Sequence, residues 1–393
     1  MKKKLFYTVK YVKWIYQLYF YLGSFVLNVL KLFVQPDDRL ILFISFGGRK
    51  FDDSPKAIYD QMITDHRFDD FRLVWALNNP EAFDLKRGEK VKCDTLSYFR
   101  TALKARVWIS NSTVERGLEF KGKNTFYFNT WHGTPIKKMG VDVGDENKSF
   151  KGKGQWRVDY FTCQGEYERD IFCRVFKGLD KNIAQVIGLP RNDIYANYSM
   201  EYMLSLRKKM NIPADKRVIL YAPTFREYDQ SSSMEVKVSV PIQINRWRKE
   251  LGEKYVLLFR AHYEVAKGLN IQDDDFVREM SSYPQLEDLM IVSDMLISDY
   301  SSIFFDYSIM PKPMLAFCYD YDRYALERGM YFDIRDWLPS ADNEIELLKL
   351  IKSGEKDVHI ARTRKFQQKY VTSFGAAVKK TLDVIYDELC RIK

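Results

Sequence analysis

The chain has 393 residues, of which 46% are hydrophobic, 29% charged and 15% aromatic. A chain of this size exceeds what one hydrophobic core usually supports, so these values exclude a single small module and a largely disordered protein and favour two domains. The five cysteines form no CxxC pair, which argues against a disulfide framework or a zinc site and fits a reducing cytoplasm.

The net charge of +9 is concentrated at the N-terminus, because residues 1–36 contain six lysines and no acidic residue. The same segment carries ten aromatic residues, and its apolar stretch, residues 14–34, is interrupted by polar side chains. A spanning helix needs about 20 mostly apolar residues. We therefore predict a membrane-associating segment at 1–36 that lies in the interface as a helix or hairpin. A spanning helix and a plain cover for the neighbouring domain are the alternatives.

Short apolar runs alternate with helical patterns in the next part of the chain. The runs predict buried strands at 39–45, 71–77, 106–110, 124–129 and 158–163, with helical patterns at 54–63 and 95–105 among them. This alternation predicts parallel strands joined by crossover helices. The first α/β domain is expected at residues 37–200.

A second series of apolar runs follows, at 217–223, 255–262, 294–299 and 313–318. It predicts a second α/β domain at residues 201–373. The tail, 374–393, has a helical stripe of apolar residues. We expect a C-terminal helix there, with the first domain as the candidate surface for it to pack against.

Polar clusters stand where the predicted strands end, and ligands of open parallel sheets collect beyond the carboxyl ends of strands. Ser301 and Ser302 follow one such strand and precede a helical pattern, so their hydroxyls are candidate phosphate ligands, with simple capping as the alternative. Arg226 follows another strand, and its guanidinium could bind a phosphate through two hydrogen bonds. Arg260 and His262 are two residues apart, so on a strand they would share a face.

His132 lies in the loop "NTWHGTPIKKMG", which contains glycine and proline and adds the charges of Lys137 and Lys138. Histidine has the side chain whose ordinary pKa best suits proton transfer near neutrality. A solitary loop histidine is usually structural or solvated. The hypothesis of a catalytic role for His132 rests on the second histidine, His262, at a strand end of the other predicted domain, beside motifs rich in phosphate ligands.

The pair Gly47-Gly48 predicts a turn ahead of a helix that has Pro55 near its start. Neither the Walker spacing nor the GxGxxG pattern is present, which disfavours a P-loop NTPase and an NAD enzyme. The remaining histidines, His66 and His359, lie in charged stretches typical of a surface, and no role is assigned to them.

Five motifs occur together and in order: "TWHGTPIKKMG", "GLPRNDIY", "YAPTFRE", "LLFRAHY" and "ISDYSSIFFDYSIMPKPMLAF". In this combination the chain resembles the CDP-glycerol glycerophosphotransferase family, the polyol-phosphate transferases of teichoic acid and some capsule synthesis. The similarity runs from about residue 40 to residue 335. "SFGGRKFDDSPKAIY" also resembles the family's segment in the acceptor-side domain.

The resemblance implies a GT-B fold, in which two Rossmann-like domains face a cleft and the C-terminal domain holds most of the nucleotide. It implies peripheral attachment to the cytoplasmic face of the cell membrane. It also implies transfer of glycerol phosphate from CDP-glycerol to a hydroxyl of an undecaprenyl-diphosphate-linked saccharide acceptor in wall teichoic acid synthesis, with release of CMP.

Carried onto this sequence, the resemblance makes His132 the candidate general base and His262 the candidate that stabilises the donor diphosphate and the departing CMP. It implies that donor phosphates are bound by Arg226, Arg260, Ser301, Ser302 and Thr224. It further gives, as candidates on the acceptor side, Gly133, Thr134, Lys137, Ser54 and Lys56. Phosphoryl transfer needs positioning and charge stabilisation more than covalent chemistry. No carboxylate cluster marks a metal site, so no tightly bound metal or cofactor is expected, although Mg²⁺ on the diphosphate stays compatible with the sequence.

Several alternatives remain open at this stage. The chain reaches its first predicted strand by residue 40, which favours a primase or short-adding enzyme over a polymerase. Among enzymes, three alternatives compete with this interpretation: CDP-ribitol as the donor, a capsule pathway, and a GT-B glycosyltransferase that uses a nucleotide sugar. Outside enzymes, the alternative is a basic protein that binds lipid or nucleic acid. No nucleic-acid-binding motif is present, so nucleic acid is not expected as a partner.

Overall fold

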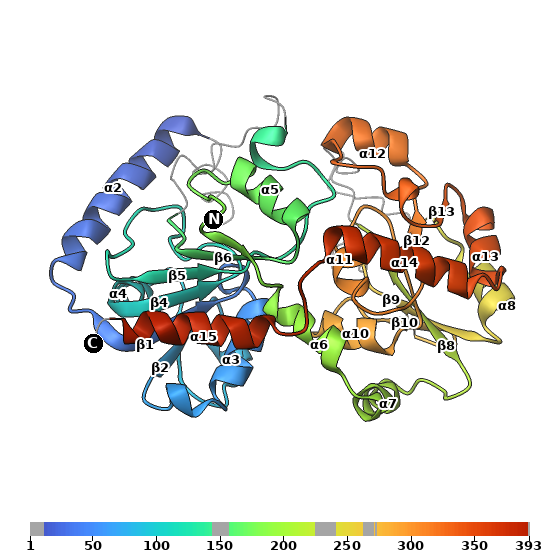
Figure 1. The fold of residues 1–393 in the computed structure, drawn as a ribbon, viewed down its shortest axis with the longest axis horizontal. Helices are drawn as coiled ribbons and strands as arrows, with labels where there is room; N and C mark the ends of the chain where they lie inside the picture. Colours follow the sequence, from blue (N-terminus) through green and yellow to red (C-terminus); the bar gives the residue numbers. More distant parts are fainter. Residues whose placement is uncertain (1–11, 144–156, 225–240, 262–270, 272, 392–393) are drawn as a thin grey trace. The chain divides into compact units, whose positions relative to one another are not determined.

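The computed structural model describes residues 12–143, 157–224, 241–261, 271 and 273–391. The chain forms two compact units. The first comprises Met1–His132, Met139–Asp193 and Thr372–Lys393, and the second comprises Gly133–Lys138 and Ile194–Val371 (Figure 1). Both are built on parallel sheets, so the α/β class expected from the alternating pattern is confirmed.

The first unit contains a seven-stranded sheet in the order β3-β2-β1-β4-β5-β6-β7, and every pairing in it is parallel. Its strands are β1 (Asp37–Ile44), β2 (Arg72–Leu77), β3 (Glu89–Lys92), β4 (Ala105–Ser110), β5 (Phe126–Asn129), β6 (Tyr160–Cys163) and β7 (Ala184–Val186). Because the strands are parallel, the loops that leave β1, β4 and β5 emerge at one edge of the sheet, side by side.

One face of this sheet is covered by α3 (Asp53–Met62) and α15 (Ala377–Cys390). Alternate residues of the central strands, such as Phe43 and Trp75, point into the same buried cluster as Leu382 and Ile385 of α15. The last 22 residues of the chain therefore belong to the first unit (Figure 1). The other helices of this unit are α2 (Lys13–Lys31), α4 (Leu96–Lys104) and α5 (Glu166–Val175), and α6 (Asp193–Asn197) begins where the second unit takes over.

Helix α2 is attached to the loop between β4 and β5. The Tyr19 hydroxyl donates to the backbone oxygen of Arg116 at 3.0 Å, and the Asn28 amide donates to the backbone oxygen of Glu119 at 2.7 Å. The outward side of α2 and the residues after it carry large apolar side chains that are more than half exposed: Trp14, Leu18, Tyr21, Leu22, Phe25, Val26, Leu32 and Phe33. Among the helices in the described residues, none has the length and apolar character required to cross a membrane.

The second unit contains a six-stranded parallel sheet in the order β10-β9-β8-β11-β12-β13. Its strands are β8 (Arg217–Ala222), β9 (Tyr255–Phe259), β10 (Val277–Glu279), β11 (Met295–Ser298), β12 (Met314–Phe317) and β13 (Ser340–Ala341). Its helices are α7 (Met200–Lys209), α8 (Ile244–Leu251), α10 (Leu286–Val292), α11 (Ile303–Tyr307), α12 (Tyr321–Arg328), α13 (Glu344–Lys352) and α14 (Lys356–Tyr370).

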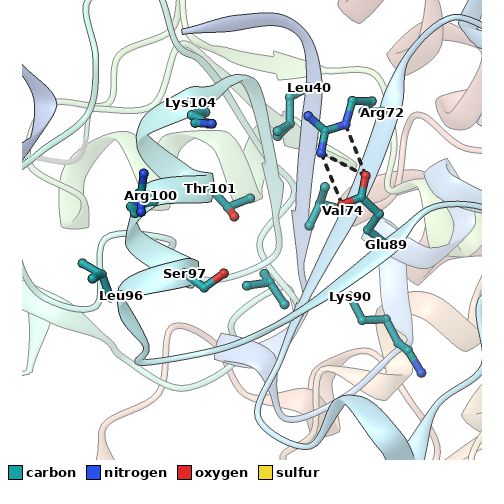
Figure 2. A pocket seen from close by; sticks show the side chains of 11 residues that line it. Leu40, Arg72, Val74, Glu89, Lys90, Leu96, Ser97, Arg100, Thr101 and Lys104 are labelled. Carbon is teal, nitrogen blue, oxygen red and sulfur yellow. Dashed lines mark hydrogen bonds and ion pairs between the residues drawn. The ribbon is translucent and has the colours of Figure 1, made fainter. Parts of the chain in front are cut away.

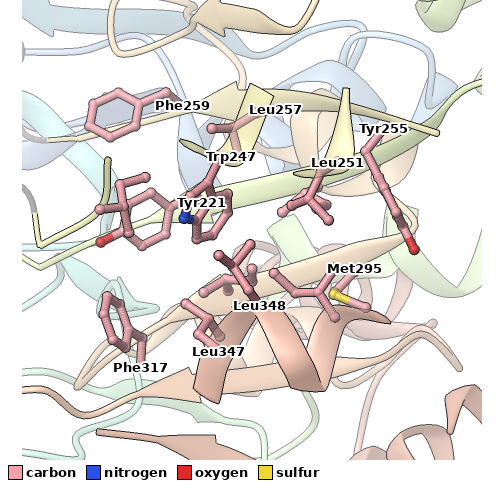
Figure 3. Packing of buried hydrophobic residues seen from close by; sticks show 14 of the residues in the cluster. Tyr221, Trp247, Leu251, Tyr255, Leu257, Phe259, Met295, Phe317, Leu347 and Leu348 are labelled. Atoms are coloured by element: carbon pink, nitrogen blue, oxygen red, sulfur yellow. The ribbon is translucent and has the colours of Figure 1, made fainter. Parts of the chain in front are cut away.

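Aromatic and aliphatic side chains fill the core on one face of the second sheet. Figure 3 shows Trp247 of α8 among Tyr221 and Phe259 of the strands and Leu347 of α13. Trp247 is fully buried, and its indole nitrogen donates to a carboxylate oxygen of Glu344 at 3.0 Å, so its single polar atom is satisfied. This packing fixes the strands whose carboxyl ends carry Thr224 and the serine pair.

Three sequence expectations need correction. Strand β9 ends at Phe259 rather than at residue 262, so the shared-face argument for Arg260 and His262 does not apply. Four strands, β3, β7, β10 and β13, were not predicted, because each has two to four residues and all four carry polar or charged side chains. His359 is not a surface residue: it lies on α14 with 3% of its surface exposed, and burial lowers the pKa of its imidazole.

Candidate functional site

Three loops meet at the carboxyl edge of the first sheet. The loop after β5 carries Trp131 and His132, the loop after β4 carries Asn111 and Ser112, and the loop after β1 carries residues 46–48. Strands β1, β4 and β5 are neighbours in the sheet, so the three loops are neighbours as well. This is the edge at which open parallel sheets bind ligands.

His132 is half-buried and oriented by a hydrogen bond. Its Nδ1 lies 2.6 Å from the backbone oxygen of Asn111, and its ring centroid lies 5.5 Å from that of Phe46 and 4.1 Å from that of Trp131. A carbonyl oxygen can only accept, so Nδ1 carries the proton of the neutral ring and Nε2 carries the lone pair. The two aromatic rings and this bond leave the imidazole one orientation.

Burial lowers the pKa of His132, whereas the hydrogen bond to Asn111 and the charge of Asp53 oppose the shift; Arg191 and Arg49 reinforce it. At neutral pH the ring is therefore uncharged and can accept a proton. A neutral imidazole with a fixed tautomer is the form that a general base requires.

The loop Phe46–Gly48 beside His132 is held by hydrogen bonds from its backbone to neighbouring segments. Phe46 N–H donates to Asn111 Oδ1 at 2.7 Å, and Gly47 N–H donates to Ser112 Oγ at 3.0 Å. The Gly47 oxygen accepts from Arg116 Nη1 at 2.8 Å. The predicted glycine turn is confirmed, since Gly47 and Gly48 have φ of 63° and 84°.

Arg116 connects this loop to two further segments. Its guanidinium donates to both carboxylate oxygens of Asp94, at 2.7 and 2.6 Å, and its backbone oxygen accepts from Tyr19 of α2. A bidentate arginine–carboxylate pair is geometrically rigid. Arg116 therefore fixes the Gly47 loop relative to α2.

Strained backbone is concentrated around this site. The described residues include six non-glycine residues with positive φ, and five of them are Phe46, Asp53, Asp94, Arg116 and Trp131. Each of these conformations has an energetic cost and persists only where the surroundings impose it, which is common at functional sites.

A buried ion pair lies near His132. Asp53 and Arg191 are 3.1 Å apart, with side chains 8% and 6% exposed. Ser54 is fully buried, and its hydroxyl accepts from the Arg191 backbone N–H at 3.3 Å. Lys56 forms an ion pair with Asp60. Of the two acceptor-side candidates on α3, Ser54 is thus part of the frame around Arg191, and Lys56 is paired on the helix surface.

The segment that follows His132 in the chain belongs to the second unit. Lys137 pairs with Met330 in an antiparallel bridge, and Lys138 N–H donates to the Gly329 oxygen at 3.0 Å. The Lys137 ammonium lies 5.2 Å from the ring centroid of Tyr324. Thr134 is fully buried. The acceptor-side candidates Thr134 and Lys137 are therefore anchored on this unit.

Gly133 and Ser302 are in close contact. A Cβ atom placed on Gly133 would stand 2.8 Å from Ser302 Oγ, so only glycine fits there without movement. Ser302 precedes α11 and makes no side-chain capping bond, whereas Ser301 Oγ accepts from the Ile303 N–H at 3.3 Å. The structure thus brings the serine pair and Gly133 together within the second unit.

Thr224 and Arg260 stand at the ends of β8 and β9. The Thr224 hydroxyl and N–H both donate to the carboxylate of Asp299, which is 2% exposed. Arg260 Nη1 donates to the backbone oxygens of Met280 and Tyr283, at 2.9 and 2.6 Å, and so anchors that loop. The other two donor-side candidates, Arg226 and His262, lie outside the described residues.

Sequence reasoning missed four groups that shape the site: the Asn111 carbonyl, Arg116, Asp53 and Arg191. The Asn111 contact is made by backbone, which no residue type announces. Asp53 and Arg191 did stand in the quoted motifs "DDSPK" and "GLPRNDIY". Both have polar or charged neighbours in the chain, Asp52 and Ser54 around the first and Asn192 after the second, so residue identity gave no signal of a buried pair.

The sequence model of the CDP-glycerol:poly(glycerophosphate) glycerophosphotransferase family matches residues 26–383. The teichoic acid glycerol-phosphate transferase of Staphylococcus aureus is 32% identical over 89% of this chain and 94% of its own length. The teichoic acid poly(glycerol phosphate) polymerase of Staphylococcus epidermidis is also 32% identical over 90% of this chain, but the chain spans only 48% of that relative, about half its length.

A solved structure of the wall teichoic acid polymerase TagF, in a histidine-to-alanine variant, superposes with a TM-score of 0.84. It is 30% identical to this chain and covers 92% of it, and the match covers 93% of that structure. Sequence and fold therefore agree over nearly the whole chain, and the protein belongs to the CDP-glycerol:poly(glycerophosphate) glycerophosphotransferase family of enzymes.

Proposed function

We propose that this enzyme transfers glycerol phosphate from CDP-glycerol to a hydroxyl of an undecaprenyl-diphosphate-linked saccharide acceptor in wall teichoic acid synthesis. Two observations support the proposal together. The chain belongs to this family, and His132 is a neutral imidazole whose Nδ1 is fixed by the Asn111 oxygen. A fixed neutral imidazole serves the one proton transfer that the reaction needs.

In the proposed reaction, the acceptor hydroxyl oxygen attacks the phosphorus that bears the glycerol. Nε2 of His132 takes the hydroxyl proton as the new P–O bond forms. The bond between that phosphorus and the bridging oxygen breaks, and CMP leaves with the bonding electron pair. The main task of the site is then to stabilise the negative charge that accumulates on the phosphoryl oxygens and on CMP.

On the donor side we propose that Ser301 and Ser302 bind the phosphates, with His262, Arg226 and Arg260 supplying positive charge. The closeness of Gly133 to Ser302 supports a tight backbone approach beside a small ligand. We propose two roles for Thr224. Its hydroxyl donates to the Asp299 carboxylate and holds it in place, and the residue contributes to the donor side.

On the acceptor side we propose Gly133, Lys137 and Lys56 as the lining, with the fully buried Thr134 and Ser54 supporting it from behind. Lys137 carries a positive charge next to the loop of His132 in the chain, which suits an acceptor that contains a diphosphate. The Asp53–Arg191 pair is proposed as the frame that keeps Ser54 and the start of α3 in position.

We further propose a GT-B arrangement, with the two units facing a common cleft and the substrates between them. The two parallel sheets and the similarity to TagF support this proposal. It predicts that substitutions at His132 in the first unit and at Ser302 in the second act on the same chemical step.

Helix α2 is proposed to lie in the cytoplasmic leaflet as a peripheral membrane anchor. Its exposed apolar side, which includes Trp14, Leu18 and Phe25, follows a helical stripe, and lysines stand in the same segment. The exposed Phe33 lies just beyond the end of the helix. Aromatic and basic side chains of this kind suit the boundary between headgroups and acyl chains. Replacing Leu22 and Phe25 by glutamate is expected to abolish flotation with vesicles while leaving the melting temperature unchanged.

The donor polyol and the number of units added are tested together. The chain is 32% identical both to a transferase and to a polymerase, so the expected primase or short-adding mode stays a prediction. Incubation with a lipid-linked disaccharide and CDP-glycerol, with CDP-ribitol in parallel, is followed by mass spectrometry of the lipid product. Short glycerol phosphate additions are expected. Ribitol phosphate in the product would overturn the donor assignment, and long chains would overturn the short-adding mode.

A further inference from the structure

A cavity of about 350 Å³ lies in the first unit, between α4 and the first halves of β1, β2 and β3 (Figure 2). Arg72 is the first residue of β2, and Glu89 is the first of β3. The loop of His132 leaves the opposite, carboxyl ends of the parallel strands. The cavity is therefore separate from the candidate active site.

The cavity walls carry four basic side chains and one carboxylate. Arg72 is neutralised by Glu89 at 3.0 Å and by Asp37 at 2.9 Å. Lys90 donates to the backbone oxygen of Phe83 at 2.9 Å. The carboxylates neutralise Arg72, whereas Lys90 keeps its charge with its ammonium engaged by a backbone oxygen. The other two cations of the cavity, Arg100 and Lys104, are both on α4.

Arg100 and Lys104 stand one turn apart on α4, and within the described part of the chain neither makes an ion pair or a side-chain hydrogen bond. Ser97 and Thr101 line the same cavity, and Figure 2 shows them projecting from α4 toward the strands. Two cations and two hydroxyls along one side of a helix match the oxygens of a phosphate group. A guanidinium and an ammonium held without an acid partner favour an external anion.

The cavity also lies close to the apolar end of α2. Leu32 and Phe33 are 79% and 80% exposed. Phe33 precedes Asp37 by four residues, which limits their separation to about 14 Å. Asp37 bonds Arg72, a cavity residue. A headgroup layer is about 5–7 Å thick, and charge is felt over about 8 Å beyond it, so both features can meet one membrane surface.

We propose that this cavity binds the phosphate of an anionic membrane phospholipid, with Arg100 and Lys104 as the principal contacts, while α2 lies in the interface. The inference rests on the membrane docking of α2 in the proposed function. It adds a preference for acidic lipid that an apolar helix alone does not supply. The bound phosphate would lie at the amino ends of the strands, opposite the edge that carries His132.

The test uses the full chain and measures flotation with two kinds of vesicle, phosphatidylcholine alone and phosphatidylcholine mixed with phosphatidylglycerol. The double variant Arg100→Gln, Lys104→Gln is compared with the matched control Arg364→Gln, Lys365→Gln on α14, whose side chains are exposed. The cavity variant is expected to lose about 30-fold in affinity for the anionic vesicles and to keep its affinity for the neutral ones. The control is expected to bind both vesicles as the wild type does.

Equal binding of the cavity variant and the wild type to anionic vesicles would overturn the cavity assignment and leave the docking of α2 standing. A wild type that binds neither vesicle would overturn both. Calorimetric titration with inorganic phosphate distinguishes the source of the phosphate: no heat is expected without lipid. Tight phosphate binding that disappears in the cavity variant would assign the cavity to a soluble anion instead. Unchanged melting temperatures confirm that each variant folds.

Discussion

The Nδ1 atom of His132 lies 2.6 Å from the backbone oxygen of Asn111, and this contact determines which nitrogen can accept a proton. Because the acceptor is a carbonyl of the main chain, side-chain substitution at Asn111 leaves the bond possible. Removing the imidazole instead removes the proposed base. His132→Ala is expected to reduce kcat by about 10²- to 10⁴-fold with little change in KM for CDP-glycerol. Steady-state kinetics on a protein with an unaltered circular dichroism spectrum measure this; a loss confined to KM would assign His132 to binding.

The expected pH profile of activity follows from the direction in which the pKa of His132 is shifted. Burial lowers it, so the fold favours the neutral ring, and protonation occurs only below the ordinary value of about 6.5. Activity is therefore expected to be complete at pH 7 and to fall on the acid side with an apparent pKa below 6.5 in kcat/KM. The unfolded chain binds this proton more readily than the folded one. The contribution of His132 to the free energy of unfolding therefore falls as the pH drops through that range. An acid limb above 7 would contradict the structure.

Arg116 is expected to position His132 through the Gly47 loop. Arg116→Gln removes the bonds to Gly47 and Asp94, and a shift of the loop misplaces the Phe46 ring against the imidazole. We expect kcat to fall by about tenfold or more, because small displacements of a reacting group are costly. Arg116→Lys should restore only part of it. The control Arg174→Gln removes a similar bidentate pair with Asp142 and should leave kcat unchanged; an equal loss there would refute the specific role.

The backbone conformation at Gly48 can be tested against a matched glycine. Gly48 has φ of 84°, and an added Cβ would lie 2.4 Å from Cys93 Sγ, whereas Gly117 has φ of 82° and open space around the Cβ position. Gly117→Ala is expected to cost about 1–2 kcal/mol through the left-handed backbone alone. Gly48→Ala should cost more, since it adds the clash. Urea denaturation of both variants measures the difference, and equal costs would mean that Cys93 moves aside freely.

Gly133 and Ser302, which both belong to the second unit, allow a double-mutant test of the close contact between them. Gly133→Ala forces its Cβ against Ser302 Oγ and is expected to lower kcat/KM by about tenfold. Ser302→Ala removes that oxygen and, as a proposed phosphate ligand, also lowers kcat/KM by itself. If the clash is the cause, the loss in the double variant should be smaller than the sum of the two single losses in free energy. Strictly additive effects would show that the two residues act independently.

The elements that the sequence predicted correctly are those with long, strongly apolar patterns. Strand β1 and the central strands of both sheets are flanked on both faces and therefore carry continuous apolar residues. Strand β3 reads "EKVK": three of its four residues are charged and exposed and only Val91 is buried, because it lies at the edge of the sheet. Its four residues contain too little periodicity to be distinguished from a loop.

The sequence nominates residue types for the candidate site but does not reveal the contacts between them. His132, Ser301 and Ser302 stood out because they follow apolar runs. The tautomer of His132 depends on a backbone oxygen 21 positions earlier, and the placement of Thr134 and Lys137 on the second unit depends on a pairing with residues 329–331. Contacts made by backbone atoms over such distances leave no signature in residue identity.

The measurement that tests the central claim most directly is acceptor-dependent release of CMP from CDP-glycerol, for the wild type and for folded His132→Ala, with a lipid-linked disaccharide as acceptor. We expect CMP release by the wild type that requires the acceptor and that is almost lost in the variant. CMP release that His132→Ala retains in full would contradict the assignment of the base. No release from CDP-glycerol, alongside release from CDP-ribitol or a nucleotide sugar, would contradict the proposed reaction itself.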